Sequence, residues 1–159
     1  MQLIYRKMEG AGNHILVVDQ RCSDAAPPPA DALQRLGDPA TGPGFDQLMW
    51  LSQARDSTTI ASYRVFNADG SEVEQCGNGV RCVVRLLAEE NGDKAAFVLE
   101  SPTGPIEARA LDDGQVAVNM GPPRFEPLDI PFIADKESVR YALDVAGKFY
   151  DVAVLSMGN

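Results

Sequence analysis

Gln75-Cys76-Gly77-Asn78-Gly79 and the run from Val80 to Asn91 form the stretch around which the chain is organised. The apolar residues of the run recur at the i, i+3, i+4, i+7 spacing of a helix: Val80, Val83, Val84 and Leu87. Cys82 and Leu86 extend this apolar surface, and only a narrow stripe is polar: Arg81, Arg85 and Glu89. A helix that is apolar on nearly all sides is normally buried. The sequence therefore predicts a tight glycine turn over 75–79, followed by a buried helix over 80–91 whose N-terminus points at Cys76.

The position of Cys76 before this helix has a chemical meaning. The N–H groups of a first helical turn lack intrahelical partners and carry partial positive charge, which favours a thiolate. The effect reaches ~2 kcal/mol, roughly one pKa unit, so we expect a lowered pKa for Cys76. Gly77 and Gly79 would also let a carboxylate or phosphate approach the backbone. The alternative is that Cys76 is a small core residue and Asn78 a simple helix N-cap.

Composition limits the class of protein. A chain of 159 residues fits one domain, and 45% hydrophobic with 23% charged residues is ordinary for a soluble globular protein. The net charge of -9 argues against nucleic acid and anionic membranes as partners. The sequence contains neither an apolar run of membrane-spanning length nor a signal-peptide pattern, so we expect a cytoplasmic protein. An odd number of cysteines and a single histidine predict no disulfide framework and no metal site.

The rest of the chain reads as short strands. Alternating patterns predict strands at 3–8, 15–19, 45–51, 62–67, 96–100, 106–110, 116–120, 139–145 and 149–155, with a short extended piece at 71–74. We expect one short helix near 31–36, a loop over 121–131, and hairpins from the strand pairs at 106–120 and 139–155. The pattern predicts an α+β fold in which a mostly antiparallel sheet surrounds one buried helix. Because the chain stops just after a predicted strand, we expect a fragment of a longer protein.

Four stretches carry a resemblance to a known family. They are Lys7-Met8-Glu9-Gly10-Ala11-Gly12-Asn13, Gly44-Phe45-Asp46-Gln47, the run from Arg64 through Asn67-Ala68-Asp69-Gly70-Ser71 to Cys82, and Ser156-Met157-Gly158-Asn159. Together they resemble the diaminopimelate epimerases, in the family's order from one end of the chain to the other. The resemblance implies two similar halves, each a curved sheet or half-barrel around a central helix, with the active site between them. Residues 1–159 would then be the N-terminal domain, and the second domain is not present in this chain.

The resemblance also implies a reaction and a set of site residues. The family interconverts LL- and meso-diaminopimelate without a cofactor, in lysine and peptidoglycan biosynthesis. Cys76 would be one of two thiols that exchange a proton with the substrate α-carbon from opposite faces, and the isolated chain would lack full activity. Backbone N–H groups of Gly77 and Asn78 would bind the α-carboxylate. The residues implied to bind the distal end of the substrate are Asn13, Gln47, Asn67 and Asn159.

Some features depart from the family pattern, and alternatives remain open. Glu9 stands where the family usually has histidine, and His14-Ile15 stands where Asp-Phe is common. We interpret His14 as a local packing or hydrogen-bonding residue. The alternative functions are another amino-acid racemase or epimerase of the same fold group, such as one like proline racemase, and a non-catalytic half that only binds. The expected partner is a small-molecule substrate, and a homodimer is an open option for the full-length enzyme.

Overall fold

The computed structural model describes residues 3–91 and 96–157, which divide into two compact units, Met1–Met120 and Gly121–Asn159. The first unit contains β1 (Arg6–Gly10), β2 (Asn13–Gln20), α1 (Ala30–Gly37), β3 (Gln47–Ser52), β4 (Ala61–Asn67), β5 (Glu72–Val73), α2 (Gly77–Asn91), β6 (Ala96–Ser101), β7 (Gly104–Ala110) and β8 (Val116–Val118). The second contains a 3₁₀ helix, η1 (Pro127–Asp129), and the hairpin β9 (Tyr141–Val145) and β10 (Lys148–Val152).

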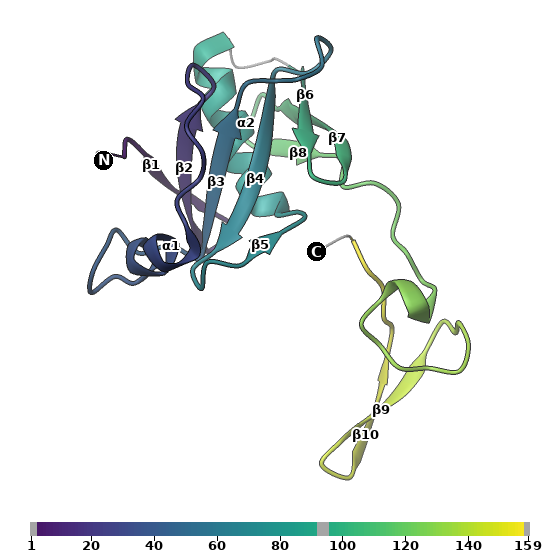
Figure 1. The fold of residues 1–159 in the computed structure, drawn as a ribbon. Helices are drawn as coiled ribbons and strands as arrows, with labels where there is room; N and C mark the ends of the chain where they lie inside the picture. The colour runs from purple at the N-terminus through teal and green to yellow at the C-terminus, as the bar shows by residue number, and fades with distance from the viewer. Residues whose placement is uncertain (1–2, 92–95, 158–159) are drawn as a thin grey trace. The chain divides into compact units, whose positions relative to one another are not determined.

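The first unit is one sheet that curls around α2 (Figure 1). Its strands follow the order β1-β2-β3-β4-β6-β7-β8, and β5 pairs with β4. Two neighbouring pairs, β2–β3 and β4–β6, are parallel, and the other pairs are antiparallel. The α+β fold with a mostly antiparallel curved sheet around one buried helix is therefore confirmed.

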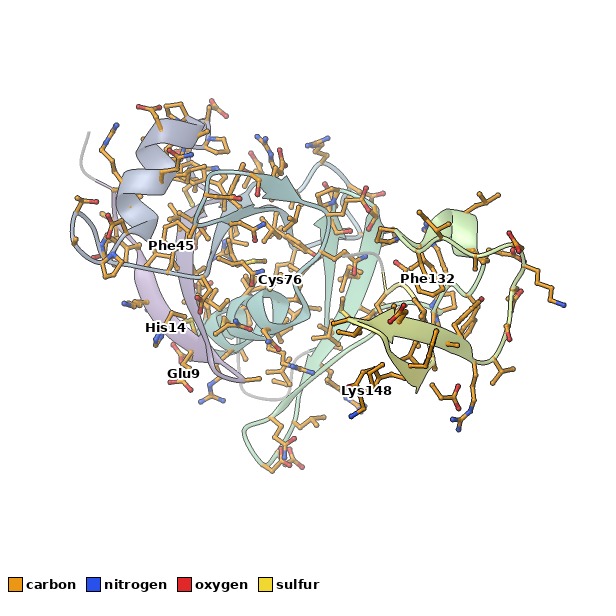
Figure 2. All side chains as sticks on the ribbon, turned by 90° about the horizontal axis from the view of Figure 1, so that it is seen from below. Glu9, His14, Phe45, Cys76, Phe132 and Lys148 are labelled. Carbon is orange, nitrogen blue, oxygen red and sulfur yellow. The ribbon has the colours of Figure 1, made fainter. Side chains whose placement is uncertain are left out.

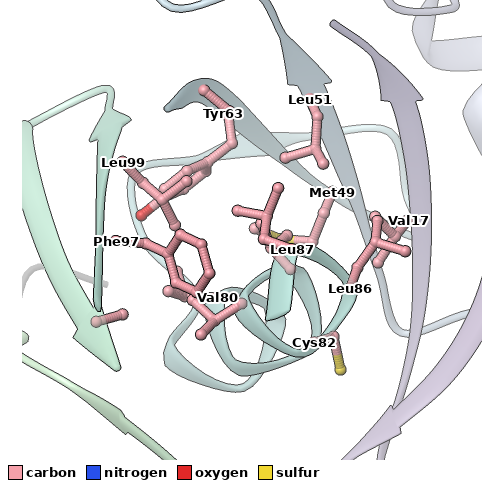
Figure 3. Close-up of a cluster of buried hydrophobic side chains, with 14 of the residues drawn as sticks. Val17, Met49, Leu51, Tyr63, Val80, Cys82, Leu86, Leu87, Phe97 and Leu99 are labelled. Carbon is pink, nitrogen blue, oxygen red and sulfur yellow. The ribbon is translucent and has the colours of Figure 1, made fainter. Parts of the chain in front are cut away.

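Alternation along the strands gives the sheet two buried faces. Ile15 and Val17 of β2 point toward α2, whereas Leu16 and Val18 point to the other face, because successive side chains alternate. On the inner face, side chains from five strands pack against the buried side of α2 (Figure 3). On the outer face, α1 packs against the sheet through a smaller cluster that includes Trp50 and Leu33. These two clusters hold α2 and the strand ends beside it in place.

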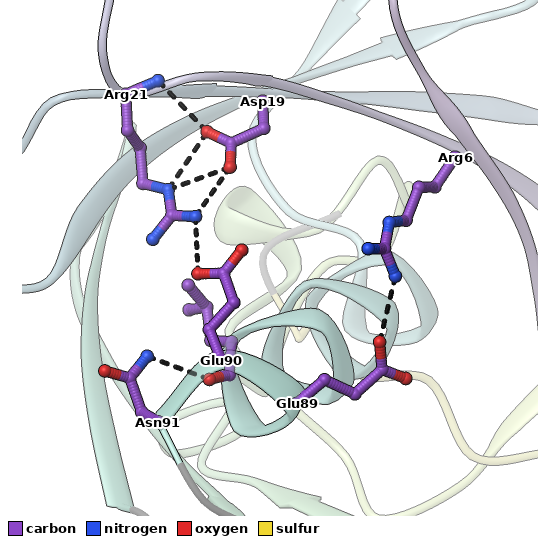
Figure 4. Close-up of polar contacts among 7 residues, drawn as sticks. Arg6, Asp19, Arg21, Glu89, Glu90 and Asn91 are labelled. Atoms are coloured by element: carbon purple, nitrogen blue, oxygen red, sulfur yellow. Dashed lines mark hydrogen bonds and ion pairs between the residues drawn. The ribbon is translucent and has the colours of Figure 1, made fainter.

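The polar side of α2 connects the helix to the first two strands. The guanidinium of Arg21, which follows β2, bonds Asp19 at 2.6 Å and reaches Glu90 of α2 at 2.8 Å (Figure 4). Arg6 of β1 forms a second pair with Glu89 at 2.9 Å (Figure 4). The predicted polar stripe is confirmed, with Arg81 and Glu89 exposed and Arg85 half-buried.

The structure corrects several predicted boundaries. The helix predicted from Val80 begins three residues earlier, at Gly77. The first strand lies at Arg6–Gly10 rather than over 3–8, because its pairing with β2 continues to the tight turn at Ala11 and Gly12. Both turn residues have positive φ, 50° and 91°. Residues 121–131, predicted as loop, include η1, whose first position is Pro127, where the fixed φ of proline suits a helical turn.

Candidate active site

Three amide side chains lie at one end of the inner face of the sheet. Asn13, Gln47 and Asn67 each lie an even number of residues from an inward-facing core residue, so the alternation of strands points them toward α2. The register sets Ile15 opposite Gln47 and Gln47 opposite Asn67. Three of the four distal-end binders predicted by resemblance therefore come from neighbouring strands of one sheet. The fourth, Asn159, lies outside the described residues.

Cys76 lies directly before α2 (Figure 2), and its side chain contacts Gln47. Its exposed fraction is 8%. The backbone N–H of Gly79 donates to Cys76 Sγ at 3.1 Å. A Cβ at position 79 would lie 3.2 Å from this sulfur and would collide with the side chain of Met49. Glycine is therefore needed at position 79 for the thiol to pack against the first turn of the helix.

The predicted lowering of the Cys76 pKa is wrong for this chain. Burial raises the pKa of the thiol more than its polar neighbours lower it. Those neighbours are the backbone N–H groups of Gly79 and Asn78 and the guanidinium of Arg81. The helix terminus therefore acts in the expected direction, but the loss of hydration outweighs it.

A chain of hydrogen bonds leads away from the thiol. Cys76 Sγ–H donates to Gln47 Oε1 at 2.8 Å, and Gln47 Nε2 donates to Asn67 Oδ1 at 3.4 Å. Asn67 Nδ2 in turn donates to Ser71 Oγ at 3.1 Å, and Ser71 Oγ donates to Asp69 Oδ1 at 2.6 Å. Of the predicted site residues, Gln47 is thus in direct contact with both Cys76 and Asn67.

A second group of polar contacts connects the β1–β2 hairpin to the start of α2. Asn78 Nδ2 donates to Asn13 Oδ1 at 2.7 Å, and Arg81 Nη1 donates to Asn78 Oδ1 at 2.7 Å. The hairpin approaches closely because Gly10 has no side chain: a Cβ there would lie 2.8 Å from the carbonyl oxygen of Asn78. Asn78, in the first turn of α2, therefore contacts Asn13. Gly77, the first residue of α2, is half-buried beside it.

Residues that the sequence reasoning missed support the cysteine turn. Gln75 is buried, and its Nε2 donates to Thr103 Oγ1 at 2.8 Å in the turn between β6 and β7. Asp69 and Ser71 were named only within the stretch that carries the family resemblance, and Ser71 was placed at the start of a short extended piece. The spacing Asp-x-Ser was a usable signal, because such a carboxylate commonly accepts a hydrogen bond from the residue two positions on. Glu9 and His14, which depart from the family pattern, lie opposite each other in the β1–β2 register and are exposed (Figure 2).

Two more titratable groups share the interior with Cys76. Burial raises the pKa of Cys82 to about 11 and that of Tyr63 to about 12. Among residues 3–91 and 96–157, no three His, Cys, Asp or Glu side chains gather into a group that could hold a metal ion. No helix in the same residues is long and apolar enough to cross a membrane.

The chain is similar in sequence to known proteins. A sequence model of a family described as diaminopimelate epimerase matches residues 5–126. Two relatives named diaminopimelate epimerase, from Pseudomonas entomophila and Laribacter hongkongensis, are 46% and 44% identical over the whole of this chain. The chain spans 58% and 57% of their respective lengths.

Solved structures share the fold. A probable proline racemase from Agrobacterium radiobacter aligns with a TM-score of 0.67 at 14% identity, over 95% of this chain and 48% of its own. A hydroxyproline epimerase from Agrobacterium vitis aligns with a TM-score of 0.62 at 16% identity, over 95% and 49% of the two chains. At such low identity these matches establish the architecture alone.

Proposed function

Since the chain belongs to the diaminopimelate epimerase family, we propose that it forms one half of the active site of an enzyme that epimerises LL- and meso-diaminopimelate, with Cys76 as one of two catalytic thiols. One observation carries the proposal. The thiol at the start of α2 lies in hydrogen-bond contact with Gln47 and, through it, Asn67, from two neighbouring strands. A base and a set of recognition amides therefore share one surface.

The chemistry requires two groups on opposite faces of the substrate. The thiolate of Cys76 takes the α-proton, and the bonding electron pair passes to the α-carbon and its carboxylate. A thiol on the opposite face then delivers its own proton to the α-carbon, so the configuration inverts and the two sulfurs exchange roles. No electrons are gained or lost, and the reaction needs no cofactor. We propose that a second, similar domain supplies the second thiol and that residues 1–159 are the N-terminal domain.

The N–H groups at the start of α2 stabilise the carbanion. The first-turn N–H groups at Gly77 and Asn78 carry partial positive charge, which favours the extra negative charge on the α-carboxylate in the transition state. Amides both donate and accept hydrogen bonds, so Asn13, Gln47, Asn67 and Asn159 suit a distal end that has a carboxylate and an ammonium group. These roles rest on the family resemblance together with the positions of the three described side chains.

The test is the exchange of the substrate α-proton for deuterium in D₂O, followed by NMR with meso- and LL-diaminopimelate. We expect the chain to catalyse exchange with little net epimerisation, because it contributes one of the two bases. Cys76→Ala should reduce exchange by about 100-fold or more, the usual contribution of a general base. Cys22→Ala is the matched control, because Cys22 is an exposed free thiol far along the chain from the site.

Three outcomes would count against the proposal. Exchange that survives Cys76→Ala would remove Cys76 from the chemistry. Rapid net epimerisation by the chain alone would remove the need for a second domain. Faster exchange on proline than on diaminopimelate would favour the alternative of a racemase like proline racemase. If the chain alone exchanges no proton, the same variants are compared in a fusion to the C-terminal remainder of the Pseudomonas entomophila relative, where the loss in Cys76→Ala must reappear.

A further inference from the structure

The hydrogen bonds that begin at Cys76 all point the same way. From the thiol through Gln47 and Asn67 to Ser71, each residue donates to the next, and the chain ends at the carboxylate of Asp69. The links measure 2.8, 3.4, 3.1 and 2.6 Å. The Gln47–Asn67 link is the longest, so it is the weakest point of the chain.

The direction is fixed at the Asp69 end. An ionised carboxylate only accepts hydrogen bonds, and Ser71 donates to it through both its hydroxyl and its backbone N–H. These bonds hold the pKa of Asp69 below its usual value, so the group is ionised at neutral pH. The Ser71 oxygen, having turned its hydrogen to Asp69, accepts from Asn67. An amide has a donor side and an acceptor side, so Asn67 in turn orients Gln47.

The consequence at the other end is a carbonyl oxygen directed at Cys76. An acceptor at 2.8 Å stabilises the S–H form and opposes the thiolate, since it offers negative partial charge to the sulfur. To donate to a thiolate, Gln47 would have to reverse its amide. Asn67 would then have to reverse as well, and the Ser71 hydroxyl would have to turn from Asp69 to Asn67.

We propose that Asp69 and Ser71 are positioning residues for Cys76: by orienting the Asn67 and Gln47 amides, they hold the cysteine in its thiol form until that chain is broken or reversed. The catalytic meaning of this step rests on the proposed function. A ligand that engages Gln47 and Asn67 takes the amides that form the chain. Recognition of the distal end of the substrate therefore frees the thiol to ionise, and the proton goes to solvent.

Other charged or titratable groups near the thiol do not replace this chain. Arg81 lowers the Cys76 pKa from the helix side. Tyr63 of β4 and Cys82 of α2 are neutral at pH 7, because burial raises the pKa of each to about 12 and about 11. The hydrogen bonds connect Cys76 to the carboxylate of Asp69. This residue precedes Cys76 by seven positions in the sequence and lies in an exposed turn.

The test is a pH titration of the cysteine ¹³Cβ resonances in the 159-residue chain with a Cys22→Ser background. Cys76→Ser assigns the two remaining signals. We expect Ser71→Ala to lower the titration midpoint of Cys76 by about 0.5 to 1 pH unit, which is roughly threefold to tenfold more thiolate at pH 7. Ser71→Thr keeps the hydroxyl and should restore the original midpoint. Asp69→Asn, which no longer forces the Ser71 hydroxyl to donate, should lower the midpoint in the same direction.

A matched control comes from a similar turn elsewhere. Asp113 Oδ1 accepts from the Gln115 N–H at 3.0 Å in the β7–β8 connection, so Asp113→Asn changes an equivalent turn with no link to the thiol. The Cys76 midpoint should not move in this variant.

Each remaining result overturns the inference. An unchanged Cys76 midpoint in Ser71→Ala, with a native far-UV circular dichroism spectrum, would show that the chain does not act on the thiol. A shift in Asp69→Asn without one in Ser71→Ala would assign the effect to the charge of Asp69 through space. If Ser71→Ala does not fold, the Cys76 midpoints of Asp69→Asn and Ser71→Thr are compared instead. Equal midpoints in these two variants would overturn the inference. The titration involves no substrate, so its failure is distinct from a failure of the exchange experiment.

Discussion

Gly79 and Cys76 show how a single missing side chain shapes the site. Without a Cβ at position 79, Met49 and the Cys76 sulfur both pack against the backbone of the first helical turn. The same packing excludes water from the thiol, and the loss of hydration raises its pKa. In the candidate site a close fit around the sulfur therefore works against ionisation. Ionisation of the thiol has to overcome this loss of hydration as well as its bond to Gln47 Oε1.

Cys82 gives a pH dependence of stability whose sign is fixed. Burial raises its pKa from the usual 9.0 to about 11, so above pH 9 the unfolded chain loses a proton that the folded chain keeps. The contribution of Cys82 to the free energy of unfolding should therefore be present in full below pH 9 and should be lost as the pH rises toward 11. We expect a loss on the order of 1–2 kcal/mol, because one pKa unit corresponds to about 1.4 kcal/mol.

Urea denaturation at pH 8 and pH 10.5 measures this effect. The decrease between the two pH values should be smaller in Cys82→Ala than in the wild-type chain, whatever the cost of the cavity at either pH. Cys22→Ala should keep the full decrease, since its thiol is exposed. Equal decreases in wild type and Cys82→Ala would show that the pKa of Cys82 is the same in the folded and unfolded chains.

At the scale of elements, α2 is fastened to the sheet by two arginines in different surroundings. The Arg21 side chain is 20% exposed and bonds both Asp19 and Glu90, whereas Arg6 is 62% exposed and bonds Glu89. Exposed pairs contribute little because water screens them, and partly buried charged hydrogen bonds contribute more. We expect Arg21→Met to lower the free energy of unfolding by about 1 kcal/mol and Arg6→Met by less than about 0.5.

Urea unfolding at low salt and in 1 M NaCl checks this difference. The effect of Arg6→Met should disappear at high salt, and part of the Arg21→Met effect should remain. Equal losses for the two variants would mean that the Asp19–Arg21–Glu90 group fastens α2 no better than a surface pair does.

Periodicity predicted the elements better than it predicted their neighbours. The spacing of Val80, Val83 and Val84 indicated α2 because a buried helix needs apolar residues on a repeating face. The parallel pairings β2–β3 and β4–β6 were not predicted, since alternation within a strand does not say which strand lies beside it. The strand boundaries also differ from the predicted ones, because pairing with a neighbouring strand decides where a strand ends.

The candidate site was predicted in its residues more than in its electrostatics. The resemblance named Gln47 and Asn67, and in the structure Gln47 contacts Cys76 while Asn67 contacts Gln47. It could not give the direction of the thiol pKa, which depends on how completely the folded chain excludes water. The contribution of Ser71 was missed because it depends on a side-chain bond to Asn67 across the turn.

At the scale of the molecule, the apolar core belongs to the first of the two compact units. Both buried clusters are made of residues before Met120. The second unit instead exposes large apolar side chains: Leu128, Ile133, Val139 and Phe149. Burial of apolar surface is the main source of stability, so the first unit contains most of what stabilises the chain.

We therefore predict that residues 1–120 fold without the second unit. Such a protein should unfold cooperatively in urea, with a free energy of unfolding within about 1 kcal/mol of that of the first unit in the whole chain, because no side chain of the two buried clusters is removed. It should also self-associate less in light scattering, since exposed apolar patches promote association and the removed residues carry several. A broad, non-cooperative transition, or stronger self-association than in the 159-residue chain, would show that residues after Met120 complete the fold of the first unit.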